Sequence, residues 1–254
     1  MLKKIVIFSF LVVFLGSCTS SKNILYYQNI DSITLKSTTY ETVLQPDDLL
    51  SIVVIGDDPE AVLPYNRPNM SLSSLQNTAT ITEQSPYTYL IDNENTINFL
   101  GIGKVKVGGL TKAAATQLLV NKLSAYLKNP TVDLRVLNFK ISVQGEVLKP
   151  GTYSVKSERI TILEALSLAG DLSIYAKRTK VLVLRENEGG KLVQRLDLTN
   201  ADFINSPFYY LHQNDVVYVE PNQTRINSSI VGPNIGIALS GLSLLVTILA
   251  LTIR

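Results

Sequence analysis

Few side chains in this chain could perform bond chemistry. Among its 254 residues there are one cysteine, one histidine and no tryptophan. His212 alone cannot complete a metal site or a Ser–His–Asp arrangement, because both need further partners. Glycan cleavage needs two placed carboxylates, and Glu146, Glu164 and Asp197 show no pairing by spacing. The sequence therefore predicts no catalytic site, no metal site and no cofactor, and a glycan-cleaving enzyme is the least favoured function.

Cys18 is placed for lipid attachment. Two lysines precede the apolar run 5–15, and Gly16 and Ser17 separate that run from the cysteine. These are the features of a secretory signal, and Leu-Gly-Ser-Cys resembles the lipobox of bacterial lipoproteins, whose cysteine receives a diacylglyceryl group. We expect a signal peptide over 1–17 and lipidation at Cys18; the alternative is an incidental buried cysteine in a cleaved leader. A lipidated Cys18 leaves no thiol for a disulfide.

The C-terminal run 235–253 carries no charge. As a helix it would be about 28 Å long, close to the ~30 Å hydrocarbon core of a bilayer. The sequence thus predicts one transmembrane helix over 233–253, in contact with membrane lipid. Small or hydroxyl residues recur every three or four positions and so share one face: Gly236, Ser240, Ser243, Thr247 and Ala250. This stripe would serve either close helix packing or the lining of a wet pore, and both require several helices.

The overall charge excludes one class of partner. The 23 basic and 21 acidic residues give a net charge of +2, and they are spread without long runs. Such a chain has no electrostatic footprint for nucleic acid. Its length allows one or two ordinary domains beside membrane segments at both ends.

One turn design occurs twice along the chain. A leucine, a polar turn and an aspartate precede a β-rich apolar run at 44–54 and again at 211–219. Asp48 and Asp215 are therefore expected to cap backbone N–H groups of these turns rather than to catalyse.

Helix and turn signals complete an α+β pattern. Thr111 is a good N-cap for a helix reaching residue 127, and Thr161 with Glu164 forms a capping box for a second helix. Structural turns are expected at four positions: Gly145, Pro150, Gly151 and Gly170. The Pro-Gly pair suits the centre of a type II turn, because proline presets φ and glycine accepts a positive φ.

Two stretches of the first half carry family motifs. Residues 45–52 read Gln-Pro-Asp-Asp-Leu-Leu-Ser-Ile, and residues 89–111 run from Tyr-Leu-Ile-Asp to Gly-Gly-Leu-Thr. They resemble the opening and the core of the Wza-like polysaccharide export family of outer-membrane lipoproteins. Asp47 stands where that family usually has glycine, and Leu100 also departs from the common motif.

The second half resembles another module. Residues 143–153, Val-Gln-Gly-Glu-Val-Leu-Lys-Pro-Gly-Thr-Tyr, and the helix at 163–170 are similar to the soluble-ligand-binding β-grasp (SLBB) domain. Family resemblance implies ring-shaped homo-oligomers, a conduit for capsular or exopolysaccharide, and an inner-membrane polysaccharide co-polymerase or chain-length regulator as partner. It assigns no sugar contact to an individual residue.

The predicted fold class is α+β, with these segments in order: signal peptide 1–17; lipidated tether 18–43, with a docking patch at 24–27; polysaccharide export domain 44–140; SLBB β-grasp domain 141–222; and transmembrane helix 233–253. The predicted function is an oligomeric conduit from the periplasm to the outside, lipid-anchored in the outer membrane with periplasmic domains. The alternative is a membrane-anchored envelope protein that binds a glycan or a partner without translocation.

Overall fold

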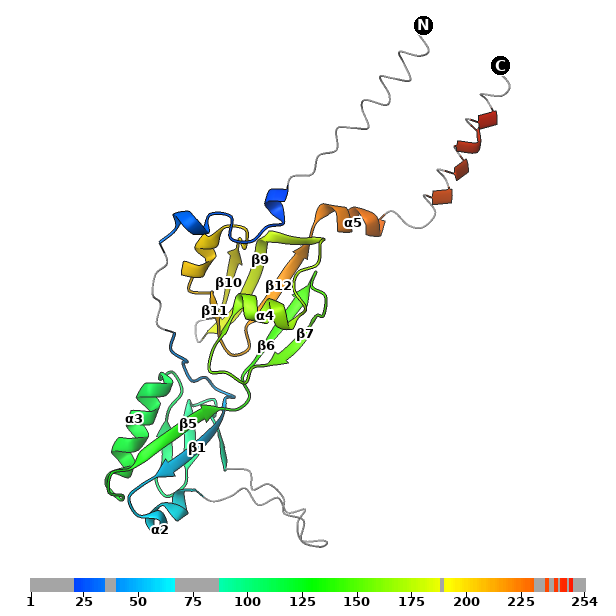
Figure 1. Cartoon of the computed structure of the whole chain (residues 1–254). Coiled ribbons are helices and arrows are strands. Elements are labelled where there is room, and N and C mark those ends of the chain that lie inside the picture. The colour runs from blue at the N-terminus through cyan, green and yellow to red at the C-terminus, as the bar shows by residue number, and fades with distance from the viewer. Residues whose placement is uncertain are drawn as a thin grey trace, which may run out of the picture.

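The described chain is organised by two separate cores. The computed structural model describes residues 21–34, 40–66, 87–187 and 190–230, and in the C-terminal tail 236–237, 240–241, 243–245 and 247–248. One cluster of buried apolar side chains is drawn from residues 44–134 and the other from residues 139–219. Figure 1 shows the two resulting units one beyond the other, with the passage from β5 to β6 between them.

The N-terminal unit is a small antiparallel sheet covered by a helix. Its sheet has the order β2-β1-β5, and Ala115, Leu119 and Leu123 of α3 are buried in its core. A hairpin of β3 and β4 adds Ile97, Phe99 and Val105 to that core. The elements are β1 (Leu49–Ile55), α2 (Pro59–Val62), η4 (Leu63–Tyr65), β2 (Thr88–Leu90), β3 (Thr96–Phe99), β4 (Gly103–Lys106), α3 (Lys112–Leu123) and β5 (Thr131–Val136).

The C-terminal unit is a five-stranded mixed sheet of order β10-β9-β12-β6-β7, with α4 packed on it. The last strand, β12, lies between β9 and β6 and pairs in parallel with β6. The elements are β6 (Lys140–Gly145), β7 (Gly151–Ser154), β8 (Ile160–Thr161), α4 (Ile162–Leu168), β9 (Ala176–Asn187), β10 (Gly190–Leu196), η6 (Ala201–Asn205), β11 (Tyr210–Leu211), β12 (Val216–Pro221) and α5 (Gln223–Ile230). Because β6 leaves the junction and β12 runs parallel to it, both strands end at the far end of this unit (Figure 1).

Residues 21–34 lie along the C-terminal unit. The Gln28 amide donates to the Thr199 carbonyl at 2.9 Å, and the Tyr26 hydroxyl donates to Asp171 Oδ1 at 2.8 Å. The Tyr27 ring packs on the core, 5.6 Å from the ring of Phe203. Two short 3-10 helices belong to this segment: η2 (Ser21–Asn23), which lies against β9, and η3 (Ile30–Ser32). The tether is thus docked through its aromatic pair.

Both predicted helix starts are confirmed. The Ala114 amide donates to Thr111 Oγ1 at 3.2 Å, although α3 ends at Leu123 rather than at residue 127. At α4 the Glu164 amide donates to Thr161 Oγ1 at 3.2 Å, while the Thr161 amide donates to Glu164 Oε2 at 2.7 Å. The capping box therefore satisfies two backbone donors reciprocally.

The prediction of a type II turn at Pro150-Gly151 is wrong. Gly151 is absent from the positive-φ residues and begins β7, opposite Val143. The loop before it is held elsewhere, because the Lys149 amide donates to the Ala169 carbonyl at 2.8 Å. The positive φ values of this region belong to Gly145, Gly170 and Asp171, at 89°, 77° and 72°.

The predicted fold class is wrong in one element, the transmembrane helix over 233–253. Among the described residues, no helix has both the length and the apolar character needed to cross a bilayer. An uncharged run meets the hydropathy requirement, but crossing also needs about 30 Å of continuous helix.

Two glycines have similar backbone angles, but only one of them lacks room for a side chain. Gly145 and Gly103 have φ values of 89° and 86°. A Cβ on Gly145 would lie 2.1 Å from the Val219 carbonyl oxygen of β12, whereas a Cβ on Gly103 would meet nothing within 4 Å. We expect Gly103→Ala to lower the free energy of unfolding by about 1–2 kcal/mol, from left-handed strain alone. Gly145→Ala should cost about 4 kcal/mol or more, because it also separates β6 from β12. Urea unfolding of both variants checks this, and equal losses would contradict it.

Candidate functional site

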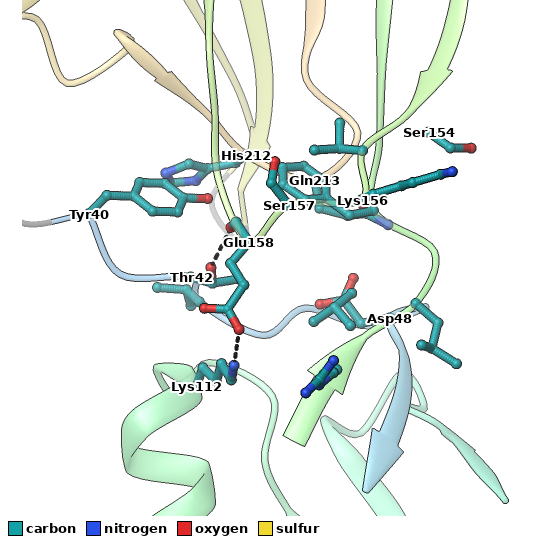
Figure 2. Close-up of a pocket in the computed structure, with 16 residues that line it drawn as sticks. Tyr40, Thr42, Asp48, Lys112, Ser154, Lys156, Ser157, Glu158, His212 and Gln213 are labelled. Carbon is teal, nitrogen blue, oxygen red and sulfur yellow. Dashed lines mark hydrogen bonds and ion pairs between the residues drawn. The ribbon is translucent and has the colours of Figure 1, made fainter. Parts of the chain in front are cut away.

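A cavity lies at the junction of the two units. Its volume is 490 Å³, and its lining comes from both sides: the segment 40–48, the start of α3 and the end of β5 from one, and residues 154–158 and 212–213 from the other. Figure 2 shows Thr42 and Lys112 facing Glu158 across this junction, with Tyr40 beside His212. The cavity is the best-defined candidate site of the described chain.

Several contacts cross between the units beside this cavity. The Lys112 ammonium, at the start of α3, pairs with the Glu158 carboxylate, and Thr42 Oγ1 donates to the Glu158 carbonyl at 3.2 Å (Figure 2). The Tyr40 hydroxyl donates to the Leu211 carbonyl at 3.3 Å. The Tyr40 ring also lies 5.9 Å from that of His212.

Asn138 is the polar centre of the junction. Its Oδ1 accepts from the Leu49 amide at 2.9 Å, and its Nδ2 donates to the Asp47 carbonyl at 2.8 Å. Its own carbonyl accepts from Gln213 Nε2 at 2.8 Å, while Gln213 Oε1 accepts from the Lys140 amide. The side chain of Asn138 thus holds the start of β1, while its backbone carbonyl holds Gln213 of the loop before β12, and together these bonds restrict the angle between the units.

The lining favours binding over bond cleavage. Three cations border the cavity, Lys112, Arg135 and Lys156, and the first two are paired with Glu158 and Asp133 respectively. Burial lowers the pKa of His212, with the nearby Arg185 charge acting in the same direction. A neutral imidazole and paired cations can orient an anionic or hydroxyl-rich group.

Asp48 closes the turn before β1 and borders this cavity. Its Oδ2 accepts from the Gln45 amide at 2.9 Å, whereas its Oδ1 is buried without a hydrogen-bond partner among the described residues. The residue is 2% exposed. Burial raises the pKa of Asp48 to about 6; the hydrogen bond from Gln45 opposes this shift, and the charge of Asp47 adds to it. Asp47 itself takes a φ of 69°, in the left-handed region that glycine favours.

Asp215 closes the corresponding turn before β12. Its Oδ2 accepts from the His212 amide at 2.8 Å, and the residue before it, Asn214, has a φ of 64°. Arg185 of β9 binds this carboxylate through two nitrogens, at 3.0 Å to Oδ1 and 2.7 Å to Oδ2. Arg185 Nη2 also donates to the Tyr210 carbonyl at 2.9 Å. The two turns share one geometry, but only the second has a buried cation opposite its carboxylate.

Sequence reasoning overlooked Arg185 as that partner. A signal existed, because Val181, Val183 and Arg185 alternate along one strand and therefore face the same side. The two valines are fully buried. An arginine in that register must find a carboxylate or carbonyls, since an unpaired buried charge is costly.

The remaining carboxylates considered for catalysis have local roles. Glu146 accepts from Ser173 Oγ at 2.7 Å, Glu164 completes the capping box, and Asp197 accepts from the Thr199 amide at 2.9 Å. Within the described ranges, no group of three or more histidine, cysteine or acidic side chains is placed to hold a metal ion. None of these three carboxylates lines the cavity.

The C-terminal stripe is satisfied within its own backbone where it is described. The hydroxyls of Ser240, Ser243 and Thr247 donate to the carbonyls of Gly236, Ser240 and Ser243, each at 2.8 Å. Ala250 and Cys18 lie outside the described residues. None of these three hydroxyl residues lines the junction cavity.

Both units match described families. Residues 36–137 match the family described as "Polysaccharide biosynthesis/export protein", and residues 139–219 match the SLBB domain. The fold thus consists of an export-family module followed directly by an SLBB module. The chain belongs to the Wza-like polysaccharide export proteins. Members of this family are transport proteins, so the prediction that the chain is not an enzyme is confirmed.

The chain is similar to two named proteins. The EPS I polysaccharide export outer membrane protein EpsA of Ralstonia solanacearum is 30% identical over 202 residues, which are 77% of this chain and 51% of that protein. The protein of the same name from Ralstonia nicotianae is 30% identical over 149 residues, covering 57% of this chain and 38% of that protein. The chain spans about half the length of these relatives or less.

The raised pKa of Asp48 predicts a pH-dependent stability. Because the folded state binds this proton more tightly than the unfolded chain, Asp48 contributes most below pH ~4, and that contribution is lost as the pH rises through about 6. The change is on the order of 3 kcal/mol. Asp48→Asn keeps an acceptor for the Gln45 amide but cannot ionise. Relative to wild type, its free energy of unfolding should therefore rise between pH 4.5 and pH 7.5, as measured by urea unfolding.

Asp48→Ala is the matched control. It removes the same charge and also the hydrogen bond to the Gln45 amide, so its unfolding free energy should follow the same pH dependence at a lower value. Parallel curves for wild type and Asp48→Asn would contradict the buried ionisation.

Proposed function

We propose that this chain is a subunit of an oligomeric outer-membrane conduit that carries capsular or exopolysaccharide from the periplasm to the outside. The observation that carries the proposal is the direct succession of an export module and an SLBB module across a polar junction centred on Asn138. A ring subunit needs its domains in a constant relation, because each neighbour must meet the same surfaces. The relatives named as polysaccharide export outer membrane proteins support the substrate and the location.

The chemistry of the described chain suits conduction. A polymer passes through a lumen when contacts are weak and repeated, since tight binding at one ring would stall it. The carboxylates described above serve turns, caps and ion pairs, so none is arranged to cut the polymer. We propose lipid attachment at Cys18, domains exposed to the periplasm, and an inner-membrane polysaccharide co-polymerase as the partner that supplies the chain.

The second candidate is a membrane-anchored envelope protein that binds a glycan or a partner without translocation. The cavity at the junction favours it, because 490 Å³ is within the range of small-ligand sites. The two candidates differ in what the assembly does: a conduit must form closed rings, whereas a binder need not.

Deletion of the gene tests export. We expect polysaccharide to accumulate inside the envelope with an unchanged repeat unit, because a conduit acts on delivery and not on synthesis. Surface polysaccharide is measured by extraction from intact cells and compared with the total after lysis. Normal surface delivery would overturn the export role, and an altered repeat unit would point to an enzyme.

Complementation and microscopy sharpen that test. Asn138→Ala, which removes the two side-chain bonds from the link between the units to Asp47 and Leu49, should restore export less well than Asn121→Ala, whose described amide bond is to Gln117 within α3. Electron micrographs of detergent-extracted wild type should contain rings. Particles without rings in a strain that still exports would favour the binder.

Cys18→Ala tests the anchor. Without the thiol, no thioether can form, and the signal peptide should remain on the chain. Intact-mass analysis of membrane-extracted protein should show loss of residues 1–17 and added acyl mass for wild type, but the full-length unmodified mass for the variant. A wild-type chain that begins at another residue would contradict lipidation at Cys18.

A further inference from the structure

Apolar side chains gather at the end of the C-terminal unit that is distant from the junction. Leu148, Ile174 and Leu25 are 66%, 61% and 56% exposed. They stand on three segments: the loop 146–149, the loop 169–175 and the docked tether. We call them, together with three less exposed neighbours, the apolar rim: Leu25, Leu148, Leu168, Ile174, Tyr175 and Ile226.

Hydrogen bonds join these segments into one surface. The Leu148 amide donates to the Asp171 carbonyl at 3.2 Å, and Asp171 Oδ1 accepts from the Tyr26 hydroxyl at 2.8 Å. On the other side, the Asn222 amide donates to the Tyr175 carbonyl at 2.7 Å, which attaches α5 to the same loop. The rim therefore belongs to the folded unit. It lies at the ends of β6 and β12, and α5 leaves from the same end (Figure 1).

The tether places a lipid surface within reach of this end. Ser21 of η2 lies only three residues after Cys18, and η2 lies against β9. Three residues of extended chain reach at most about 10 Å. If residues 21–34 were released from the C-terminal unit as a whole, the next point fixed to the folded units would be Tyr40, and 22 residues of extended chain reach about 75 Å. Docking of residues 21–34 therefore shortens the chain between Cys18 and its first fixed point on the folded units from 22 residues to three.

We propose that the apolar rim rests in the headgroup region of the lipid leaflet that holds Cys18. This rests on the proposed lipidation and outer-membrane location. Exposed leucine, isoleucine and tyrosine side chains gain free energy at such an interface, and tyrosine can keep its hydroxyl in water. This short connection to Cys18 favours lipid over another protein as the occupant, because it keeps the rim beside the bilayer at all times. The junction and the N-terminal unit then point away from the membrane.

Single introduced cysteines test this in the full-length lipidated chain. Lipid on Cys18 leaves no native thiol, so Ile174→Cys and Leu148→Cys each carry one site for an environment-sensitive fluorophore. Leu63→Cys in η4 and Leu192→Cys on β10, 65% and 48% exposed, are the matched controls. In phosphatidylcholine vesicles with brominated acyl chains, the rim labels should lose at least half of their fluorescence relative to unbrominated vesicles. The control labels should be unchanged.

A second experiment releases the tether from the C-terminal unit. Tyr26→Ala with Tyr27→Ala should leave the protein on the vesicles but return the label at position 174 to the control value. Retained circular dichroism and urea unfolding show that the C-terminal unit is still folded.

Three results would overturn the proposal, and they differ in meaning. Protein that floats with the vesicles but shows equal quenching at all four positions overturns the rim and leaves the proposed function standing. Rim labels that are shielded yet not quenched, with crosslinks between chains at position 174, show that a second copy covers the rim. Protein that does not float with vesicles removes the anchor itself.

Discussion

The closure of the C-terminal unit depends on the buried ion pair between Arg185 and Asp215. Their side chains are 6% and 0% exposed, and the guanidinium joins β9 to the turn before β12. Because β12 is the last strand to be made and still occupies the centre of the sheet, something must fix its start between β9 and β6. Removal of one partner from such a pair typically costs about 3–5 kcal/mol, since the other charge stays buried. Because β12 must start between β9 and β6, the arginine and the aspartate that fix its start are buried there.

The N-terminal unit solves the same local problem without a cation. Asp48 repeats the turn geometry of Asp215, with one carboxylate oxygen on the amide three residues earlier. Its second oxygen has no partner among the described residues, and its pKa rises to about 6 as a result of burial. This asymmetry lies beside the junction cavity, where Asn138 and Gln213 hold the two units together. The junction therefore holds the polar contacts that link the two units. It also holds Asp48, whose carboxylate has one buried oxygen without a hydrogen-bond partner among the described residues.

The segment 21–34 is held on the C-terminal unit. Tyr26 and Tyr27 hold residues 21–34 on the C-terminal unit, and burial together with the Asp171 carboxylate raises the pKa of the Tyr26 hydroxyl, so it remains a donor. This segment is therefore part of the folded C-terminal unit, held there by a few side chains and backbone hydrogen bonds.

The sequence by itself determined the local features: the N-cap at Thr111, the capping box of Thr161 and Glu164, the α+β character and the two family modules. These depend on side chains three or four residues apart, so short-range geometry decides them. Only the tertiary structure decided that Arg185 meets Asp215, that Asn138 bridges the units, and that the aromatic pair docks on a core far along the chain. It also corrected the transmembrane helix and the type II turn. The physical reason is that an apolar run or a Pro-Gly pair shows only which structures a segment can adopt. Helix length and backbone angles also depend on the contacts that the rest of the fold makes with that segment.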